Sequence, residues 1–223
     1  MDYSLAIEGS TYAGSVAVIR DRDVVAERTL ADSGIPSRAG RDERILPSVA
    51  ECLSDVGIAA RNLARVVCGA GPGSFTSLRV SASVAKGIAV GAGCPLFGVS
   101  SLILQVSGQP SGVYLSVLPA MREEFFALQV EVSDSGGLIA RAAPLIVSAT
   151  DLGNVAHKLE AQIIGAGQDM DAAPHARNVA PLLDSIIATG PVDIDTWEPD
   201  YGRLAEAQVR WEAAHGRPLG AAT

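Results

Sequence analysis

The chain has 223 residues, 48% of them hydrophobic, and its 17 Lys and Arg residues against 25 Asp and Glu give a formal net charge of −8. This length is enough for one large hydrophobic core or for two lobes of about a hundred residues each. Because affinity for nucleic acid comes largely from cationic contacts with phosphates, so acidic a chain is excluded as a general nucleic-acid binder on its own.

Cysteine content and the N-terminus point to a reducing compartment. Cys52, Cys68 and Cys94 are an odd number with no close pair, and apolar residues surround them, so we expect reduced core cysteines and no disulfide framework. The first residues lack a basic segment followed by a long apolar run, and no stretch reaches the length of a membrane span. The sequence therefore predicts a cytoplasmic protein.

The first part of the chain alternates between strand-forming and helix-forming patterns. Apolar runs at 4–8, 15–20 and 24–30, separated by short turns, predict an antiparallel meander of three strands. After a polar loop at 31–40, the segment 41–56 has apolar residues at helical spacing and acidic residues on the opposite face. This pattern predicts an amphipathic helix.

A glycine-rich turn at 69–73 follows a short apolar strand and opens a helix of about five turns. Gly71 and Gly73 allow backbone conformations that a β-carbon blocks, and Ser74 or Thr76 can cap the free amides of the first helical turn. Helix starts of this kind can hold phosphate groups. Two interpretations stay open: a phosphate-binding loop and a purely structural, capped turn.

Neither of the two established phosphate-binding loops fits this turn. A Walker loop needs Gly-Lys-Ser/Thr at its close, but the nearest lysine, Lys86, lies well inside the helix. A dinucleotide-binding fingerprint needs a third glycine at the position of Ser74.

The helix at 74–91 has little polar surface. Its charged residues are Arg79 and Lys86, which lie seven positions apart and so on one face. Small side chains recur at every fourth position and form a ridge: Ser77, Ser81, Ala85 and Ala89. Such a ridge permits close approach, so we expect this helix to be covered by its own sheet, by a partner, or by both.

The second half repeats the order of elements of the first half. The pattern predicts three strands, a helix, a strand and a helix at 113–118, 124–132, 138–144, 150–160, 162–165 and 179–189. Two copies of one α/β unit are typical of the two-lobed, actin-like (duplicated ribonuclease H-like) architecture, with a mixed sheet flanked by helices in each lobe. We place the first lobe at 1–106 and the smaller second lobe at 107–196.

The residues from Gly71 to Ala89, GPGSFTSLRVSASVAKGIA, resemble the signature of the bacterial TsaB (YeaZ) family, in which Ser77 is usually glycine. WEPDYGR at 197–203 resembles the close of that family, which implies that a last helix, 197–215, returns to the first lobe. The segment 41–47 resembles a helix start of the family, with Arg41 or Asp42 in place of its histidine.

The resemblance implies a non-catalytic scaffold in the complex that makes N6-threonylcarbamoyladenosine at position 37 of tRNA. The implied partners are the transferase TsaD, as a heterodimer that activates it, and the ATPase TsaE. A homodimer is implied for the chain alone, and tRNA would be contacted only indirectly.

The helices at 41–56 and 74–91 both have apolar surface to spare, so they are the predicted partner interface. The alternative is that they only cover their own sheet. The predicted interface residues are Ile45, Leu46, Val49, Leu53, Phe75, Thr76, Leu78, Arg79, Ser81, Ala82 and Lys86.

The second functional hypothesis is an actin-like small kinase or ATPase with its own nucleotide site. The third hypothesis is a subunit that binds ADP or ATP only at the joint interface with a partner. The residues concerned are Glu8, Ser10, Thr11, Gly71, Gly73 and Ser74. Glu8 stands where ATP-using members of the superfamily carry Asp, but Ala120 replaces the second acidic position, and one glutamate does not make a magnesium site. Otherwise Glu8 is expected to be a surface residue at a strand end. No catalytic or metal-binding residue is predicted, because His157, His175 and His215 form no His-x-x-x-His pair.

Overall fold

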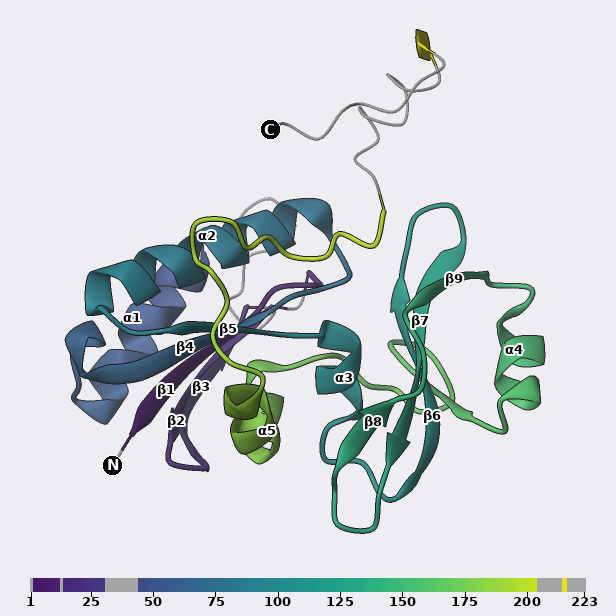
Figure 1. The fold of residues 1–223 in the computed structure, drawn as a ribbon, viewed down its shortest axis with the longest axis horizontal. Helices are drawn as coiled ribbons and strands as arrows, with labels where there is room; N and C mark the ends of the chain where they lie inside the picture. The colour runs from purple at the N-terminus through teal and green to yellow at the C-terminus, as the bar shows by residue number, and fades with distance from the viewer. Residues whose placement is uncertain (1, 13, 31–43, 204–213, 216–223) are drawn as a thin grey trace.

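The computed structural model describes residues 2–12, 14–30, 44–203 and 214–215, and it contains two five-stranded sheets flanked by helices (Figure 1). The strands of the first sheet are β1 (Tyr3–Glu8), β2 (Ser15–Arg20), β3 (Asp23–Thr29), β4 (Leu63–Gly69) and β5 (Leu96–Val99). Their spatial order is β3-β2-β1-β4-β5, antiparallel from β3 to β1 and parallel from β1 to β5. The predicted three-stranded meander is confirmed.

Two long helices cover one face of the first sheet. These are α1 (Ile45–Val56) and α2 (Phe75–Ala92), and their buried side chains join those of the strands in one apolar cluster. Each helix ends at a glycine in the left-handed conformation, Gly57 with φ 73° and Gly93 with φ 67°, where a β-carbon would be unfavourable. Residues 31–43, which include the predicted start of the first helix, lie outside the described residues.

The other face of the first sheet is covered by a segment from late in the chain. The 3₁₀ helix η5 (Ala176–Leu182) and the helix α5 (Leu183–Ala188) pack with β1, β2 and β5 in a second apolar cluster. The helix predicted at 179–189 therefore exists, but it lies on the first sheet and not on the second. Helical spacing identifies an apolar face without saying which sheet it will cover.

The second sheet consists of β6 (Gly112–Pro119), β7 (Glu124–Val132), β8 (Leu138–Ala140), β9 (Leu145–Ser148) and β10 (Gln162–Ile164). Its order is β10-β6-β7-β8, and β9 also pairs with β7. The helix α4 (Leu152–Lys158) packs on one face, and α3 (Ser101–Val106) packs on the other.

The prediction of one continuous strand at 138–144 is wrong in detail. The structure has two separate strands, β8 and β9, which pair with different parts of β7. Between them, Arg141 N–H still donates to the Gln129 carbonyl, and Pro144 then interrupts the pairing. Proline has no N–H to donate to a ladder, so a strand breaks readily there.

The helix α3 links the two lobes. The buried Gln105 donates through its side-chain amide to the carbonyls of Val117 (3.1 Å) and Ile164 (2.7 Å) in the second sheet. On the same helix, Ile103 packs against the apolar clusters of both lobes. The lobe boundaries at 106 and 196 remain a prediction, although α5 shows that the second range is not confined to the second sheet.

The ridge of small residues on α2 faces the helix's own sheet. Ser77, Ser81 and Ala85 are fully buried, and a β-carbon on Gly9 would lie 1.8 Å from Ser81 Oγ. Small side chains are needed here because the turn after β1 approaches the helix closely. The sequence predicted that the helix's own sheet, a partner, or both would cover this ridge, and in the structure its own sheet covers it.

Cys52, Cys68 and Cys94 are free thiols, as predicted. Burial raises the pKa of the Cys52 thiol to about 11 and also raises the pKa of Cys68, so both are held as inert thiols in the core. Within the described ranges, no helix combines the length and the apolarity needed to cross a bilayer.

Candidate functional site

Glu8, at the end of β1, is buried, although the sequence analysis expected it to be a surface residue. Its side chain is 1% exposed, and Oε1 accepts a hydrogen bond from the Ser10 N–H (2.6 Å) while the Ser101 hydroxyl donates to Oε2 (2.9 Å). Burial raises the pKa of Glu8, and these hydrogen bonds partly oppose that shift. The end of β1 turns inward under the glycine-rich turn, and this encloses the carboxyl group.

The glycines of the turn are explained by close approach of the chain to itself. An added β-carbon would lie 2.0 Å from Glu8 Oε2 at Gly69, 2.3 Å from the Asp200 carbonyl oxygen at Gly71, and 2.2 Å from the Ser10 carbonyl oxygen at Gly73. The structural interpretation of these glycines is therefore sufficient.

The amides of the turn are largely engaged inside the molecule. Ser74 N–H donates to the Ser10 carbonyl (2.8 Å), and Gly71 N–H donates to Ser101 Oγ (3.2 Å). The predicted side-chain cap is absent at Ser74, whose Oγ instead lies 3.1 Å from Ser77 Oγ. The amides of Gly71 and Ser74 are therefore not free to bind a phosphate.

The six residues of the nucleotide hypothesis do meet at one edge of the first sheet, because β1 and β4 are parallel neighbours. Among the described residues, the Thr11 hydroxyl has no hydrogen-bond partner. No group of three or more potential metal ligands occurs among the described residues. Whether a nucleotide binds at this edge stays a prediction.

The predicted interface residues divide into a buried and an exposed set. Six lie within the fold's own core, at most 8% exposed: Ile45, Val49, Leu53, Leu78, Ser81 and Ala82. Leu46 (56% exposed), Phe75 (42% exposed), Thr76 and Arg79 face outward, and Lys86 is half-buried. The first six stabilise the lobe, so only the remaining five are accessible to a partner in this conformation.

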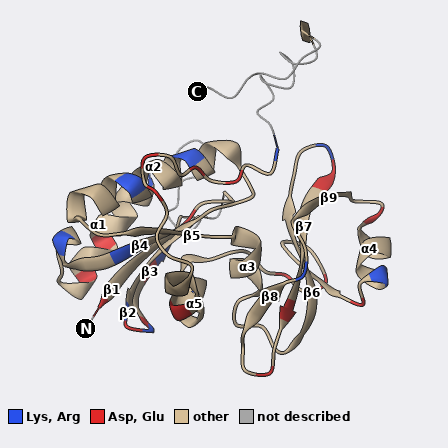
Figure 2. Ribbon diagram, viewed as in Figure 1, with Lys and Arg blue, Asp and Glu red and all other residues tan. Residues whose placement is uncertain are grey.

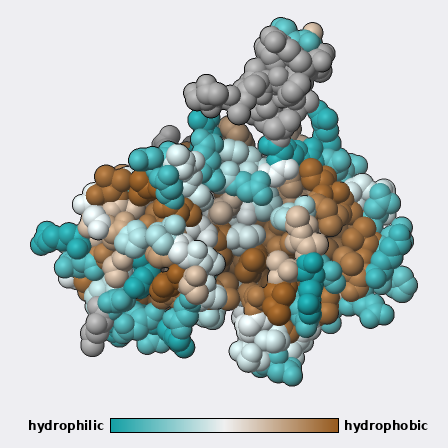
Figure 3. All heavy atoms as spheres, in the orientation of Figure 1, coloured by the Kyte–Doolittle hydropathy of each residue, from teal (hydrophilic) through white to brown (hydrophobic). Residues whose placement is uncertain are grey.

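The exposed face of α2 also contains residues that the sequence-based prediction missed. Thr76, Arg79, Ser83, Gly87 and Val90 recur at helical spacing and are all exposed, with Val90 at 66%, and we call them the α2 stripe. The sequence held a signal for them, because they continue the spacing that starts at Thr76 and Arg79. Figure 2 shows how few charges α2 carries, and Figure 3 shows apolar surface over its C-terminal half.

Residues 197–203 lie along α2, so this part of the predicted return to the first lobe is observed, although the backbone there is irregular and not helical. Tyr201 and Phe75 have ring centroids 4.5 Å apart. The Lys86 ammonium nitrogen lies 5.9 Å from the centre of the Trp197 ring. Residues 204–213, the rest of the predicted helix, lie outside the described residues.

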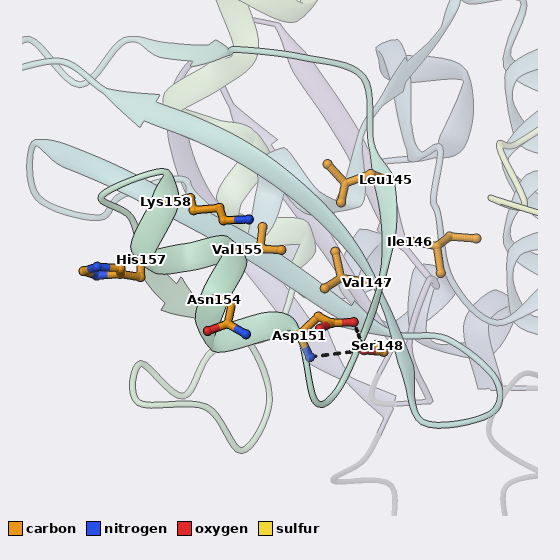
Figure 4. A pocket seen from close by; sticks show the side chains of 9 residues that line it. All are labelled: Leu145, Ile146, Val147, Ser148, Asp151, Asn154, Val155, His157 and Lys158. Atoms are coloured by element: carbon orange, nitrogen blue, oxygen red, sulfur yellow. Dashed lines mark hydrogen bonds between the residues drawn. The ribbon is translucent and has the colours of Figure 1, made fainter.

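A groove of about 610 Å³ lies on the second lobe, between β9 and α4 (Figure 4). Leu145, Val147 and Val155 supply its apolar wall, and the Ser148 hydroxyl donates to the Asp151 carboxylate (2.6 Å). None of the predicted site residues lines this groove.

Comparison with known proteins finds similarity to TsaB proteins along most of the chain. TsaB of Bacillus subtilis, "tRNA threonylcarbamoyladenosine biosynthesis protein TsaB", is 26% identical over 93% of this chain and 96% of its own length. The protein of the same name from Escherichia coli is 36% identical over 47% of this chain and 42% of its own length. Along nearly its whole length the chain is therefore similar to a TsaB protein.

A solved structure and a family model add to this similarity. A crystal structure from Pseudomonas aeruginosa, of an uncharacterized protein with similarity to peptidase YEAZ, superposes with a TM-score of 0.75 at 22% identity and covers 91% of this chain and 100% of its own. A sequence model described as "TsaD: tRNA N6-adenosine threonylcarbamoyltransferase" matches residues 24–115. The predicted two-lobed, actin-like α/β fold is confirmed.

Proposed function

We propose that this chain is a non-catalytic subunit of the machinery that makes N6-threonylcarbamoyladenosine in tRNA, and that it binds and activates a TsaD-like threonylcarbamoyltransferase. The names of the curated TsaB relatives support the pathway. The observation that carries the role of a binding subunit is the exposed α2 stripe together with the exposed Leu46 on α1.

The α2 stripe has the properties of an interface core. It contains one charge, Arg79, on a chain with a formal net charge of −8, so little charge would lose its hydration on contact. Gly87 has open space around it, and Ser83 and Thr76 are short, so a partner helix can approach the backbone closely. Val90 on α2 and Leu46 on α1 supply exposed apolar area.

A partner with a similar first lobe fits this surface. The TsaD sequence model matches residues 24–115, a range that contains both α1 and α2. A TsaD-like partner would present the same two helices, and four helices would then pack around a pseudo-two-fold axis. The same argument gives a homodimer for the chain alone, in competition with the heterodimer.

The remaining assignments also belong to this proposal. A TsaE-like ATPase would act on the heterodimer, and tRNA would be held by the partner, because this chain is acidic. ADP or ATP would bind at the joint interface and not to the chain alone. Titration of ADP into each protein and into the complex tests the last point, since binding to the isolated chain would contradict it.

The alternative of an actin-like kinase or ATPase is less well supported. The Glu8 carboxylate is enclosed and accepts hydrogen bonds from Ser10 and Ser101, which leaves it poorly placed to hold a hydrated metal ion. Magnesium-dependent ATP turnover by the isolated chain, lost in Glu8→Ala, would favour this alternative.

Size-exclusion chromatography with light scattering tests the proposed function. The chain is mixed with its cognate TsaD as wild type, as Arg79→Glu, and as the control Arg20→Glu, which reverses an exposed charge at the end of β2. We expect a one-to-one complex for wild type and Arg20→Glu, and an affinity at least about tenfold lower for Arg79→Glu. Absence of a wild-type complex, with or without ATP, would overturn the proposal.

A further inference from the structure

Residues 197–203, which we call the strap, are anchored to the first lobe at the glycine-rich turn. The Asp200 N–H donates to the Ala70 carbonyl (2.7 Å), and the Asp200 carbonyl oxygen occupies the space beside Gly71 where a side chain would stand. The Trp197 ring fills the space beside Gly98 in the same way, 3.2 Å from an ideal β-carbon to Nε1. Three contacts therefore hold the first part of the strap.

The end of the strap is anchored to the second lobe. Gly202 adopts φ 68°, and a β-carbon there would lie 2.4 Å from the Phe126 ring. The Arg203 guanidinium forms an ion pair with the Glu124 carboxylate at the start of β7 and lies over the Phe126 ring, 5.9 Å from its centre. Both charged side chains are about one-third exposed or less, at 27% and 34%.

Between its two anchors the strap holds a residue of the proposed partner surface. The Tyr201 ring packs against Phe75, the first residue of α2, and the Arg79 guanidinium carbon lies 5.3 Å from the centre of the Phe75 ring. Phe75 is 42% exposed, so its ring contacts the strap on one side and remains accessible to a partner. Aromatic pairs of this geometry contribute beyond the area they bury.

The strap connects the lobes at a place separate from α3 and from the segment that runs from β10 to η5. Figure 1 shows α3 between the two sheets, whereas the strap crosses from α2 toward β7 at the outer side of the molecule. Hinge rotation of one lobe against the other becomes more restricted as separated connections are added, so the strap further restrains the angle between the lobes.

We propose that the strap couples the second lobe to the α2 surface: it restrains the angle between the lobes and, through Tyr201, sets the position of Phe75. A partner that contacts Phe75 and Arg79 then alters the strap, and a change at β7 alters partner affinity to the same extent, because coupling between two equilibria is reciprocal. The partner half of this inference rests on the proposed function. The intramolecular half does not.

Amide exchange in the isolated full-length chain tests the intramolecular half. Arg203→Ala removes the anchor on the second lobe, and Arg141→Ala is the matched control because it removes an Arg–Glu ion pair, with Glu131, that lies entirely within the second lobe. We expect the Asp200 amide to exchange at least about fivefold faster in Arg203→Ala and at the wild-type rate in Arg141→Ala. Equal rates in the two variants would overturn the coupling.

Binding to the cognate TsaD tests the partner half. We expect Tyr201→Ala and Arg203→Ala each to weaken binding by about fivefold or more, and Tyr201→Phe, which keeps the ring contact, to bind like wild type. If wild type binds and all three variants bind equally, the coupling is contradicted while the proposed function stands. If wild type does not bind, the proposed function fails, and the exchange experiment alone decides on the strap.

Discussion

The two faces of α2 are both rich in small residues, yet they differ in every contact. On the inner face, Ser77 and Ser81 are fully buried, and the turn at Gly9 leaves no room for a larger side chain. On the outer face, Ser83 is exposed and Gly87 has nothing within 4 Å of an ideal β-carbon. Small residues at helical spacing thus allow the helix to pack closely on its own sheet on one side, and on the other side they leave a flat, exposed surface.

The largest expected effect compares serine with leucine on the two faces. Ser81→Leu forces a larger side chain against the turn at Gly9 and removes the hydrogen bond from Ser81 Oγ to the Ser77 carbonyl (2.8 Å). We expect the free energy of unfolding to fall by about 1–3 kcal/mol or more, measured by urea denaturation. Ser83→Leu, the matched variant on the outer face, should change it by less than about 0.5 kcal/mol. Similar losses in both variants would contradict the assignment of the faces.

The next effect concerns the carboxyl group that lies beneath the inner face. The pKa of Glu8 is raised above its usual value of 4.5 by burial, so the folded state holds that proton more tightly than the unfolded state. This contribution to stability is present below pH 4.5 and is lost as the pH rises through the higher, folded-state pKa.

Glu8→Gln removes this titration while it keeps an acceptor for the Ser10 N–H. We therefore expect the stability of Glu8→Gln relative to wild type to increase from pH 5 to pH 8, as measured by urea denaturation across that range. A difference that stays constant with pH would show that the carboxyl group is not buried as described. The comparison with wild type cancels the titration of the other carboxyl groups.

The smallest effect is expected from Gly87→Ala on the outer face. Glycine costs a helix interior up to about 1 kcal/mol relative to alanine, and the added methyl group meets no atom within 4 Å. At a protein concentration low enough to keep the isolated chain monomeric, we expect it to gain about 0.5–1 kcal/mol in thermal or urea unfolding. Gly93→Ala is the control, because Gly93 also has open space but adopts φ 67°, where alanine is strained. A loss of stability in Gly87→Ala would mean that the outer face is covered.

The alternation of apolar residues and the turn chemistry of the chain were sufficient to predict the meander of β1, β2 and β3, the helices α1 and α2, and the glycine-rich turn between β4 and α2. These are local features, because helical or strand periodicity and glycine turns depend on neighbours within a few positions. The motif from Gly71 to Ala89 was also sufficient to predict the similarity to TsaB proteins.

The tertiary structure alone decided which residues of that motif are accessible. Leu78, Ser81 and Ala82 carry the same helical signal as Thr76, Ser83 and Gly87, yet the first three are buried against the chain's own first lobe. Likewise, the sequence predicts a helix near 179–189 and a return of 197–203 to the first lobe, but not that α5 covers the first sheet or that Arg203 reaches Glu124. Such contacts join residues far apart in the chain, and their partners depend on how whole layers pack, which no local pattern encodes.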